Sequence, residues 1–268
     1  MQIMKKNQFP TYIILFLLFF ISFTACEEEP NILHPEVDPF DEVVVAQNVT
    51  VKLMNGTPDV SVSGSGDLST VQLNVSEGIL TVALANPGSA QSVVVEIYHN
   101  DLVSVSCTQN GNLNFASDFT TSSPTLTVRG YNNAAIFSYY KLSADTLDIG
   151  LSDESFLGFR DVEASKNMLT MWSGTLCFLE GSATNQIIEM TGACYYNLAD
   201  METEWPFAGP LQAENSWVKA KDGATAWVHA TTYLNAVGTT GSKVYYKGDP
   251  ATIEENMTNG AELIQKNQ

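Results

Sequence analysis

Leu-Thr-Val at 126–128, Leu-Asp-Ile at 147–149, Leu-Thr-Met at 169–171 and Ile-Glu-Met at 188–190 repeat one pattern, in which a polar residue separates two apolar ones. Val103-Ser104-Val105 is an earlier copy, and the five copies follow one another at steps of 23, 21, 22 and 19 residues. Such alternation is typical of a β-strand with one buried face. A period near 20 residues is typical of the coils of a β-solenoid, which must stack because one coil cannot bury its apolar side alone. The stretch therefore predicts an all-β solenoid with irregular coils of about 20 residues.

Two further features accompany most copies of this pattern. A small or turn-forming pair follows first: Arg129-Gly130, Ser152-Asp153, Ser173-Gly174 and Thr191-Gly192. An aromatic residue comes next: Phe137, Phe156, Phe178 and Tyr196. Glycine, aspartate and serine are turn residues, so we expect the pairs to carry the chain from one strand to the next. We expect the aromatic residues to stack on one another inside the solenoid as an internal ladder.

The strand pattern runs from residue 40 to residue 250 and predicts a single solenoid domain over 40–250. Ahead of the repeats, alternating or fully apolar runs typical of strands occupy 42–45, 49–53, 60–62, 71–75, 79–82 and 93–98. Residues 203–210 contain two prolines and predict a loop inserted between coils. Residues 251–268 are predicted as a C-terminal tail, with two conformations left open. One is a helix that starts near Asp249-Pro250, and the other is a last pair of strands around Asn259-Gly260.

The first 25 residues have the layout of a secretory signal. Lys5 and Lys6 precede an apolar run at 12–23, which is shorter than the ~20 residues of a spanning helix. Cys26 directly follows Thr-Ala, as in bacterial lipoproteins, where the thiol at this place is acylated. We therefore predict a lipoprotein signal peptide at 1–25 and lipidation of Cys26, whose acyl chains would make membrane lipid a partner. A plain secretory signal with an incidental cysteine is the alternative.

Three glutamates, Glu27 to Glu29, follow the cysteine. They resemble the export signal of surface lipoproteins in some Gram-negative bacteria, which predicts an outer membrane lipoprotein that is exposed on the cell surface. A solvated linker is the alternative interpretation of such a charge run. Residues 26–39, acidic and rich in proline, are predicted to be a tether.

The chain is strongly acidic, with a formal net charge of −18. Loss of Lys5 and Lys6 with the signal leaves 10 basic against 30 acidic residues, a net charge of −20. Nucleic acids and anionic lipid surfaces require a basic face, so both are excluded as expected partners. The mature part keeps Cys107, Cys177 and Cys194, which we interpret as small buried thiols; a Cys177–Cys194 disulfide stays open. No cysteine spacing is typical of a zinc site, and no metal or other cofactor is expected.

Four segments, taken in order, resemble the putative auto-transporter adhesin, head GIN domain family. They are Phe40-Asp41-Glu42-Val43, Glu77-Gly78-Ile79-Leu80, Asp222-Gly223-Ala224-Thr225-Ala226-Trp227-Val228 and Val244-Tyr245-Tyr246-Lys247-Gly248-Asp249-Pro250. The resemblance covers about 40–250. It implies a right-handed β-helix-like solenoid with an adhesive role and no known catalytic residues. The family's Ser-Gly-Ala-Ser repeats are degraded here to Ser173-Gly174-Thr175 and Thr191-Gly192-Ala193, and the proline-containing insertion is unusual.

Three functions are compatible with these features. The first is a surface-displayed adhesion or interaction protein with an unknown protein or glycan ligand. The second is a glycan-binding module, for which Trp205 is the candidate contact because it lies in the insertion between Glu204 and Pro206. Other aromatic candidates are Tyr139, Tyr140, Trp172, Tyr195, Tyr196 and Trp217.

The third function is a polysaccharide-acting enzyme, because some of these enzymes use β-helices. Their chemistry needs basic residues and carboxylates on one face. Only Arg129, Lys141 and Arg160 are basic between Lys52 and Lys166. No Gly-x-Ser-x-Gly motif is present. We therefore predict no catalytic residues and no enzyme activity.

Overall fold

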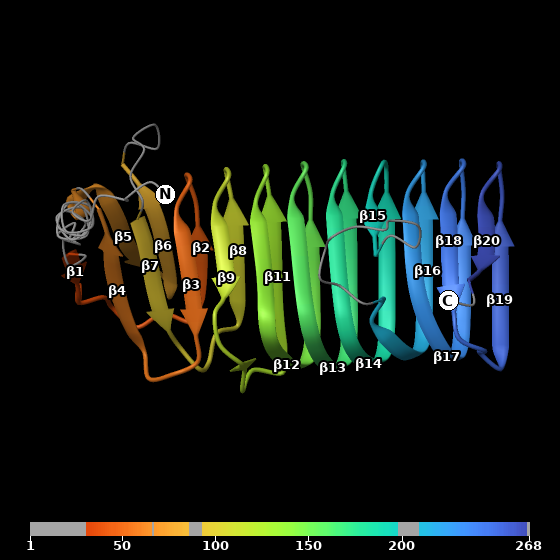
Figure 1. Cartoon of the computed structure of the whole chain (residues 1–268), viewed down its shortest axis with the longest axis horizontal. Coiled ribbons are helices and arrows are strands. Elements are labelled where there is room, and N and C mark those ends of the chain that lie inside the picture. Colours follow the sequence, from red (N-terminus) through yellow and green to blue (C-terminus); the bar gives the residue numbers. More distant parts are fainter. Residues whose placement is uncertain (1–30, 66, 86–92, 198–208, 267–268) are drawn as a thin grey trace, which may run out of the picture. The chain divides into compact units, whose positions relative to one another are not determined.

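The described residues from 32 onward wind into a stack of β-coils that pair mostly in parallel, one beside the next (Figure 1). The computed structural model describes residues 31–65, 67–85, 93–197 and 209–266. The stack has about seven turns and is almost entirely β-structure, so the predicted all-β solenoid is confirmed. Within the described residues, no helix has the length and apolar character that a membrane crossing requires.

The amino-terminal strands are β1 (Asn31–Leu33), β2 (Glu42–Val45), β3 (Thr50–Met54), β4 (Asp59–Gly64), β5 (Val71–Ser76), β6 (Ile79–Leu84) and β7 (Val93–Tyr98), with a short 3-10 helix η1 (Leu68–Thr70). The coils continue with β8 (Ser104–Thr108), β9 (Asn112–Phe115), β10 (Phe119–Thr120), β11 (Thr125–Tyr131), β12 (Ala135–Leu151), β13 (Phe156–Trp172) and β14 (Leu176–Thr191). The last strands are β15 (Tyr195–Tyr196), β16 (Gln212–Lys221), β17 (Thr225–Gly238), β18 (Lys243–Lys247), β19 (Thr252–Met257) and β20 (Glu262–Gln265).

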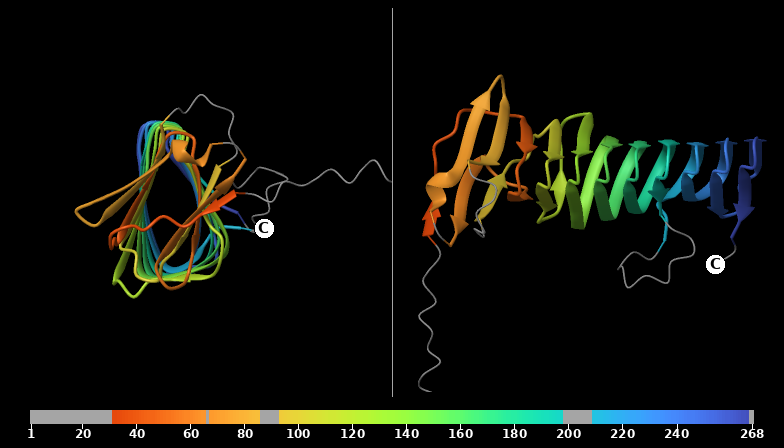
Figure 2. Two further views of the ribbon diagram at one scale, coloured as in Figure 1. Left: turned by 90° about the vertical axis from the view of Figure 1, so that its left-hand side faces the viewer. Right: turned by 90° about the horizontal axis from the view of Figure 1, so that it is seen from above.

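Each long strand contributes to three sides of its coil, as β13 illustrates. Its residues 166–172 pair in parallel with 185–191 of β14, and we call this side face A. Its residues 156–159 pair with 176–179 and form face B. Between them, residues 162–164 pair with 181–183 and form the corner. Seen along the stack, the strands of these sides enclose the interior (Figure 2, left).

Tight turns connect face A of one coil to face B of the next, and Figure 1 shows them in a row along the top. Their central residues have positive φ, as at Asp153 (55°) and Glu154 (61°). The turns bond to one another across coils; for example, the Asn133 N–H donates to the Asp153 carbonyl at 2.9 Å. The predicted turn at Ser173-Gly174 is confirmed by φ values of 57° and 75°.

The predicted turn at Arg129-Gly130 is wrong, because both residues lie within β11. Gly130 faces the interior, where a Cβ atom would lie 2.9 Å from Cδ2 of Leu151. The glycine is therefore explained by close packing between coils. The sequence alone does not distinguish a glycine required by close packing from a glycine required by a turn.

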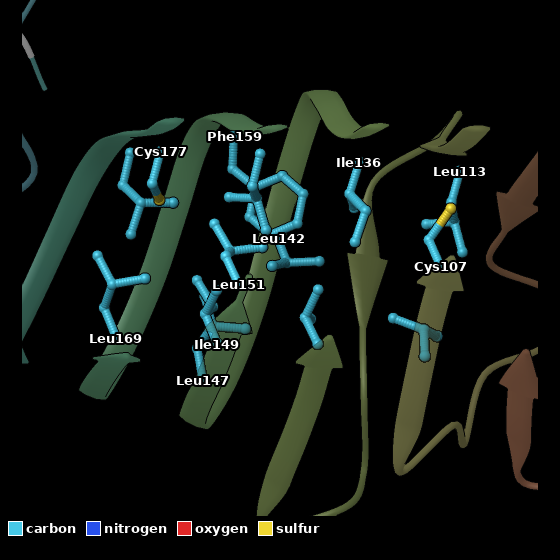
Figure 3. Close-up of a cluster of buried hydrophobic side chains, with 14 of the residues drawn as sticks. Cys107, Leu113, Ile136, Leu142, Leu147, Ile149, Leu151, Phe159, Leu169 and Cys177 are labelled. Carbon is cyan, nitrogen blue, oxygen red and sulfur yellow. The ribbon is translucent and has the colours of Figure 1, made fainter. Parts of the chain in front are cut away.

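Columns of apolar side chains fill the interior, and Figure 3 shows part of this packing. One column on face A consists of residues that are at most 2% exposed: Val105, Val128, Ile149, Leu169, Ile188, Val218 and Ala236. A buried valine, leucine or isoleucine contributes about 1.5–3 kcal/mol, so such columns hold the coils together.

The register of the repeats differs from the predicted one at a single step. Leu126 stacks on Leu147 as expected, but Leu147 stacks on Asn167, so the predicted partner Leu169 lies two residues further along. Side chains in a strand alternate with period two, so a shift of two residues leaves every side chain on its expected face.

The predicted internal aromatic ladder is wrong. Phe156 is in register with Ala135 and Leu176, and Phe137 with Gly158 and Phe178; both columns lie on the outer side of face B. Tyr196 points inward, in register with Cys177. The interior instead holds Phe115 in edge-to-face contact with Phe119 at 5.3 Å and with Phe159 at 5.5 Å between ring centroids.

The two ends of the stack differ. At the amino-terminal end β4 runs antiparallel to β7, and β5 runs antiparallel to β6 through the turn at Glu77-Gly78. At the other end β19 pairs with β17 and β20 with β18, so residues 252–265 contain strands and the helix alternative is wrong. No further strand pairs with β19 or β20 in the described part of the chain.

Candidate functional site

A groove of about 590 Å³ runs along the corner from β10 to β17, and we call it the corner groove. Its floor consists of Ala144, Ala164 and Ala183, which are in register on successive coils. Alanine is small, so the surface is recessed along this row. Strand pairing spaces successive coils by about 4.8 Å, so the residues that line the groove repeat at this interval along the stack.

Rows of hydroxyl, carboxyl and amide groups line the two walls of the corner groove. One wall is a column in register: Thr120, Ser143, Glu163, Ser182 and Gln212. The other wall follows the alanine row: Asp145, Ser165, Thr184, Glu214 and Thr231, with Thr121 at one end. These groups donate and accept hydrogen bonds, and they suit an elongated, polar ligand.

Charge in the corner groove is negative and partly compensated. Lys141 forms an ion pair with Glu163, and the hydrogen bond that its ammonium group donates to this carboxylate is the main cause that raises the pKa of Lys141. Asp145 and Glu214 add two more carboxylates to the walls. Among the described residues, no group of three or more His, Cys, Asp or Glu side chains is placed to hold a metal ion.

A second feature, which we call the aromatic shelf, lies on the outer side of face A around Trp217 and Tyr233. Their ring centroids are 5.5 Å apart with an interplanar angle of 50°. Trp217 is 38% exposed and Tyr233 is half-buried. Trp217 is in register with Ile187 on one side and Asn235 on the other, and Asn215 is in register with Tyr233.

The aromatic candidates from the sequence are scattered over the solenoid. Tyr139 and Tyr140 are exposed on β12 between face B and the corner, and Trp172 is 45% exposed at the end of face A. Tyr195 is exposed on face B. Trp205 and Cys26 lie outside the described residues, so their predicted roles stay predictions.

Tyr196 is excluded as a surface contact, because its side chain is fully buried. Burial raises the pKa of its phenol, and the side-chain amide N–H of Gln186 donates to its oxygen at 2.7 Å. Gln186 stacks between Asn167 and Ser216, and all three are buried polar residues in an otherwise apolar interior. The apolar repeat pattern does not reveal this polar column, because the polar residues lie two positions before the apolar residues Leu169, Ile188 and Val218.

Cys107, Cys177 and Cys194 are free and buried, which confirms the interpretation as small interior residues and excludes the Cys177–Cys194 disulfide from this structure. Burial raises the pKa of Cys107 to about 12 and that of Cys177 well above its ordinary value. Thiols held protonated in this way are poor nucleophiles.

The three basic residues weighed for polysaccharide chemistry are each engaged in an ion pair. Arg129 contacts Asp148 at 2.7 Å, Arg160 contacts Glu180 at 3.8 Å, and Lys141 contacts Glu163. Arg129 lies on face A and Lys141 at the corner, so the two do not form one reaction centre.

Sequence reasoning also missed the corner groove. The available signal was an alanine three residues before an inward-facing residue on each of three successive coils, at Ala144, Ala164 and Ala183. Hydrophobic periodicity identifies strands from large apolar residues, so a row of alanines does not indicate a groove.

The comparisons with known proteins agree with this architecture. The family model described as "Putative auto-transporter adhesin, head GIN domain" matches residues 39–250. No curated protein matches the chain.

Three similar solved structures come from Parabacteroides. A putative lipid binding protein from P. distasonis ATCC 8503 has a TM-score of 0.74 at 13% identity, and a putative adhesin from the same strain has 0.70 at 16%. A putative adhesin from P. merdae ATCC 43184 has 0.71 at 14%. Each alignment covers 90% of this chain and 98% of the other. At these identities the likeness is one of fold.

Proposed function

Because the chain belongs to the putative auto-transporter adhesin, head GIN domain family, we propose that it is a binding protein of the cell surface, anchored by lipid at Cys26, with an adhesive role. The corner groove carries this proposal. It is long, open and lined by hydrogen-bonding side chains, a form that suits holding an extended ligand better than enclosing a reaction.

Membership of an adhesin-like family supports a binding role over a catalytic one. The described cysteines are buried, and Arg129, Lys141 and Arg160 each form an ion pair with a carboxylate. We therefore assign no catalytic residue and no cofactor to the protein.

The anchoring part of the proposal rests on the first residues of the sequence. The layout at 1–25, the cysteine after Thr-Ala and the glutamates at 27–29 support an outer membrane lipoprotein with its solenoid outside the cell. A lipid anchor would present the solenoid at the boundary where adhesion takes place. The acidic chain would stay soluble there and would repel nucleic acid.

Filling the corner groove tests the adhesive role. Ser165 is exposed on a groove wall, so Ser165→Trp is expected to reduce attachment of expressing cells to their target surface by about tenfold, without changing the melting temperature. Ser76→Trp is the matched control, because Ser76 is equally an exposed strand serine but lies on β5. If attachment does not depend on the protein, or survives Ser165→Trp, the corner groove is not the adhesive surface.

Loss of the lipidated cysteine tests the anchor. Cys26→Ala is expected to move the protein from the membrane fraction to the soluble or secreted fraction, because no acyl chain is then attached. Fractionation and protease treatment of intact cells measure both location and exposure. A Cys26→Ala variant that stays in the membrane fraction contradicts the anchor, and a wild-type protein that resists the protease contradicts surface display.

A further inference from the structure

We propose that the aromatic shelf on face A is a binding site for an uncharged saccharide, with Trp217 as the stacking ring and the neighbouring asparagines as its hydrogen-bonding partners. This inference rests on the proposed binding role and names the class of ligand that would be bound. The occupant is a neutral glycan chain, because three properties of the shelf favour that chemistry.

The first property is the exposed aromatic surface. Trp217 is 38% exposed although it lies mid-strand, and Tyr233 supports it from the next coil at 5.5 Å between ring centroids. Half-buried Met168 and Ile187 continue the same column on the other side. The faces of aromatic rings carry partial negative charge, so they attract the weakly positive C–H groups on one side of a pyranose ring.

The second property is a set of amides around the ring. The Asn215 Nδ2 group donates to Asn185 Oδ1 at 3.1 Å, which fixes both side chains beside Trp217. Asn235, on the next coil, donates to Tyr233 Oη at 3.3 Å and to Glu254 at 2.9 Å. An amide offers two donors and one acceptor, so Asn185 Nδ2 and Asn215 Oδ1 keep hydrogen-bonding capacity beyond their mutual bond. A donor and an acceptor side by side match neighbouring sugar hydroxyls.

The third property is neutrality in a strongly acidic protein. The eight neighbours of Trp217 on three coils are Asn185, Ile187, Glu189, Asn215, Lys219, Tyr233, Asn235 and Val237. The only charged members, Glu189 and Lys219, form an ion pair at 3.6 Å. The net charge of Trp217 and these eight neighbours is therefore zero, with the carboxylate of Glu254 on the next coil accepting the hydrogen bond from Asn235, while the chain carries −18. A neutral ligand matches the patch, whereas the surrounding field repels an anionic polymer.

The aromatic shelf also adjoins the corner groove. Glu214 of the groove wall directly precedes Asn215, and Thr231 lies two residues before Tyr233 on the same strand. A chain of sugars that stacks on Trp217 can therefore continue toward the hydroxyl rows of the groove.

Binding of defined oligosaccharides to the full-length protein in detergent tests this site. The probes are neutral gluco-, manno- and N-acetylglucosamine oligomers, with polygalacturonate as the anionic probe. At least one neutral oligomer is expected to bind, and Trp217→Ala is expected to weaken that binding at least about tenfold. Trp217→Phe keeps a ring and is expected to retain most of the affinity.

Trp172→Ala is the matched control, because Trp172 is a comparably exposed tryptophan on face A outside the aromatic shelf. Binding of no neutral oligomer, preference for polygalacturonate, or equal losses of affinity for Trp172→Ala and Trp217→Ala would each overturn the saccharide site.

Attachment of whole cells separates the saccharide site from the proposed adhesive role. If cells attach but Trp217→Ala cells attach equally, the saccharide site fails and the adhesive role stands; if wild-type cells do not attach, the adhesive role itself fails.

Discussion

Replacing Gly181 by alanine is expected to lower the free energy of unfolding by about 3 kcal/mol or more. Gly181 has a φ of +117°, which L side chains rarely adopt. Its Cβ atom would also overlap the backbone nitrogen and carbonyl oxygen of Val162 on the preceding coil. Backbone of a paired strand cannot move aside as a flexible side chain does, so both costs act together. Urea unfolding of the full chain measures the change.

Gly209→Ala is the matched control for this variant. Among the described residues, a Cβ atom at Gly209 would have no heavy atom within 4 Å, and its φ lies outside the left-handed range. We expect a change below about 0.5 kcal/mol there. If the two alanine variants unfolded at the same urea concentration, a glycine at position 181 would not be required for the stability of the corner.

Replacing Glu255 by valine is expected to make the protein associate through its carboxyl-terminal coil. Glu255 occupies an inward position of β19, directly after the buried column that ends at Ala236. Ile253 is 42% exposed beside it, because no coil covers this end in the described part of the chain. An inward-pointing charge on an edge strand deters another chain from pairing with it. The valine would remove that charge and extend the apolar column.

The expected size of this effect follows from burial. A symmetric contact would bury one new valine from each copy, worth about 3 kcal/mol together, which corresponds to a dissociation constant about 100-fold lower. Light scattering coupled to size-exclusion chromatography measures it. Glu254→Val is the matched control, since Glu254 loses the same charge but faces outward, where it accepts a hydrogen bond from Asn235. Equal association of both variants would assign the effect to net charge alone.

The candidate site was less accessible to sequence reasoning than the fold. The sequence identified Trp217 and Trp172 as aromatic candidates, and the structure exposes both. The sequence does not show which of the two tryptophans is the better candidate, because they differ in the residues that neighbour them on other coils. Tyr233 and Asn185 are distant from Trp217 in sequence and reach it only through strand pairing. The corner groove escaped notice for the same reason, since each of its rows takes one residue from each coil.

Alternation in the sequence by itself determined the fold class and the inward or outward direction of most side chains. Val128, Ile149, Leu169 and Ile188 are buried as their pattern predicts, because a strand turns every second side chain to the same face. The tertiary structure alone decided which residues stack. It placed Asn167 on Leu147 and brought Gln186 beneath Asn167. The physical reason is that a shift of two residues between coils preserves every local preference. Only the packing of whole coils, through contacts such as Gly130 against Leu151, selects one register.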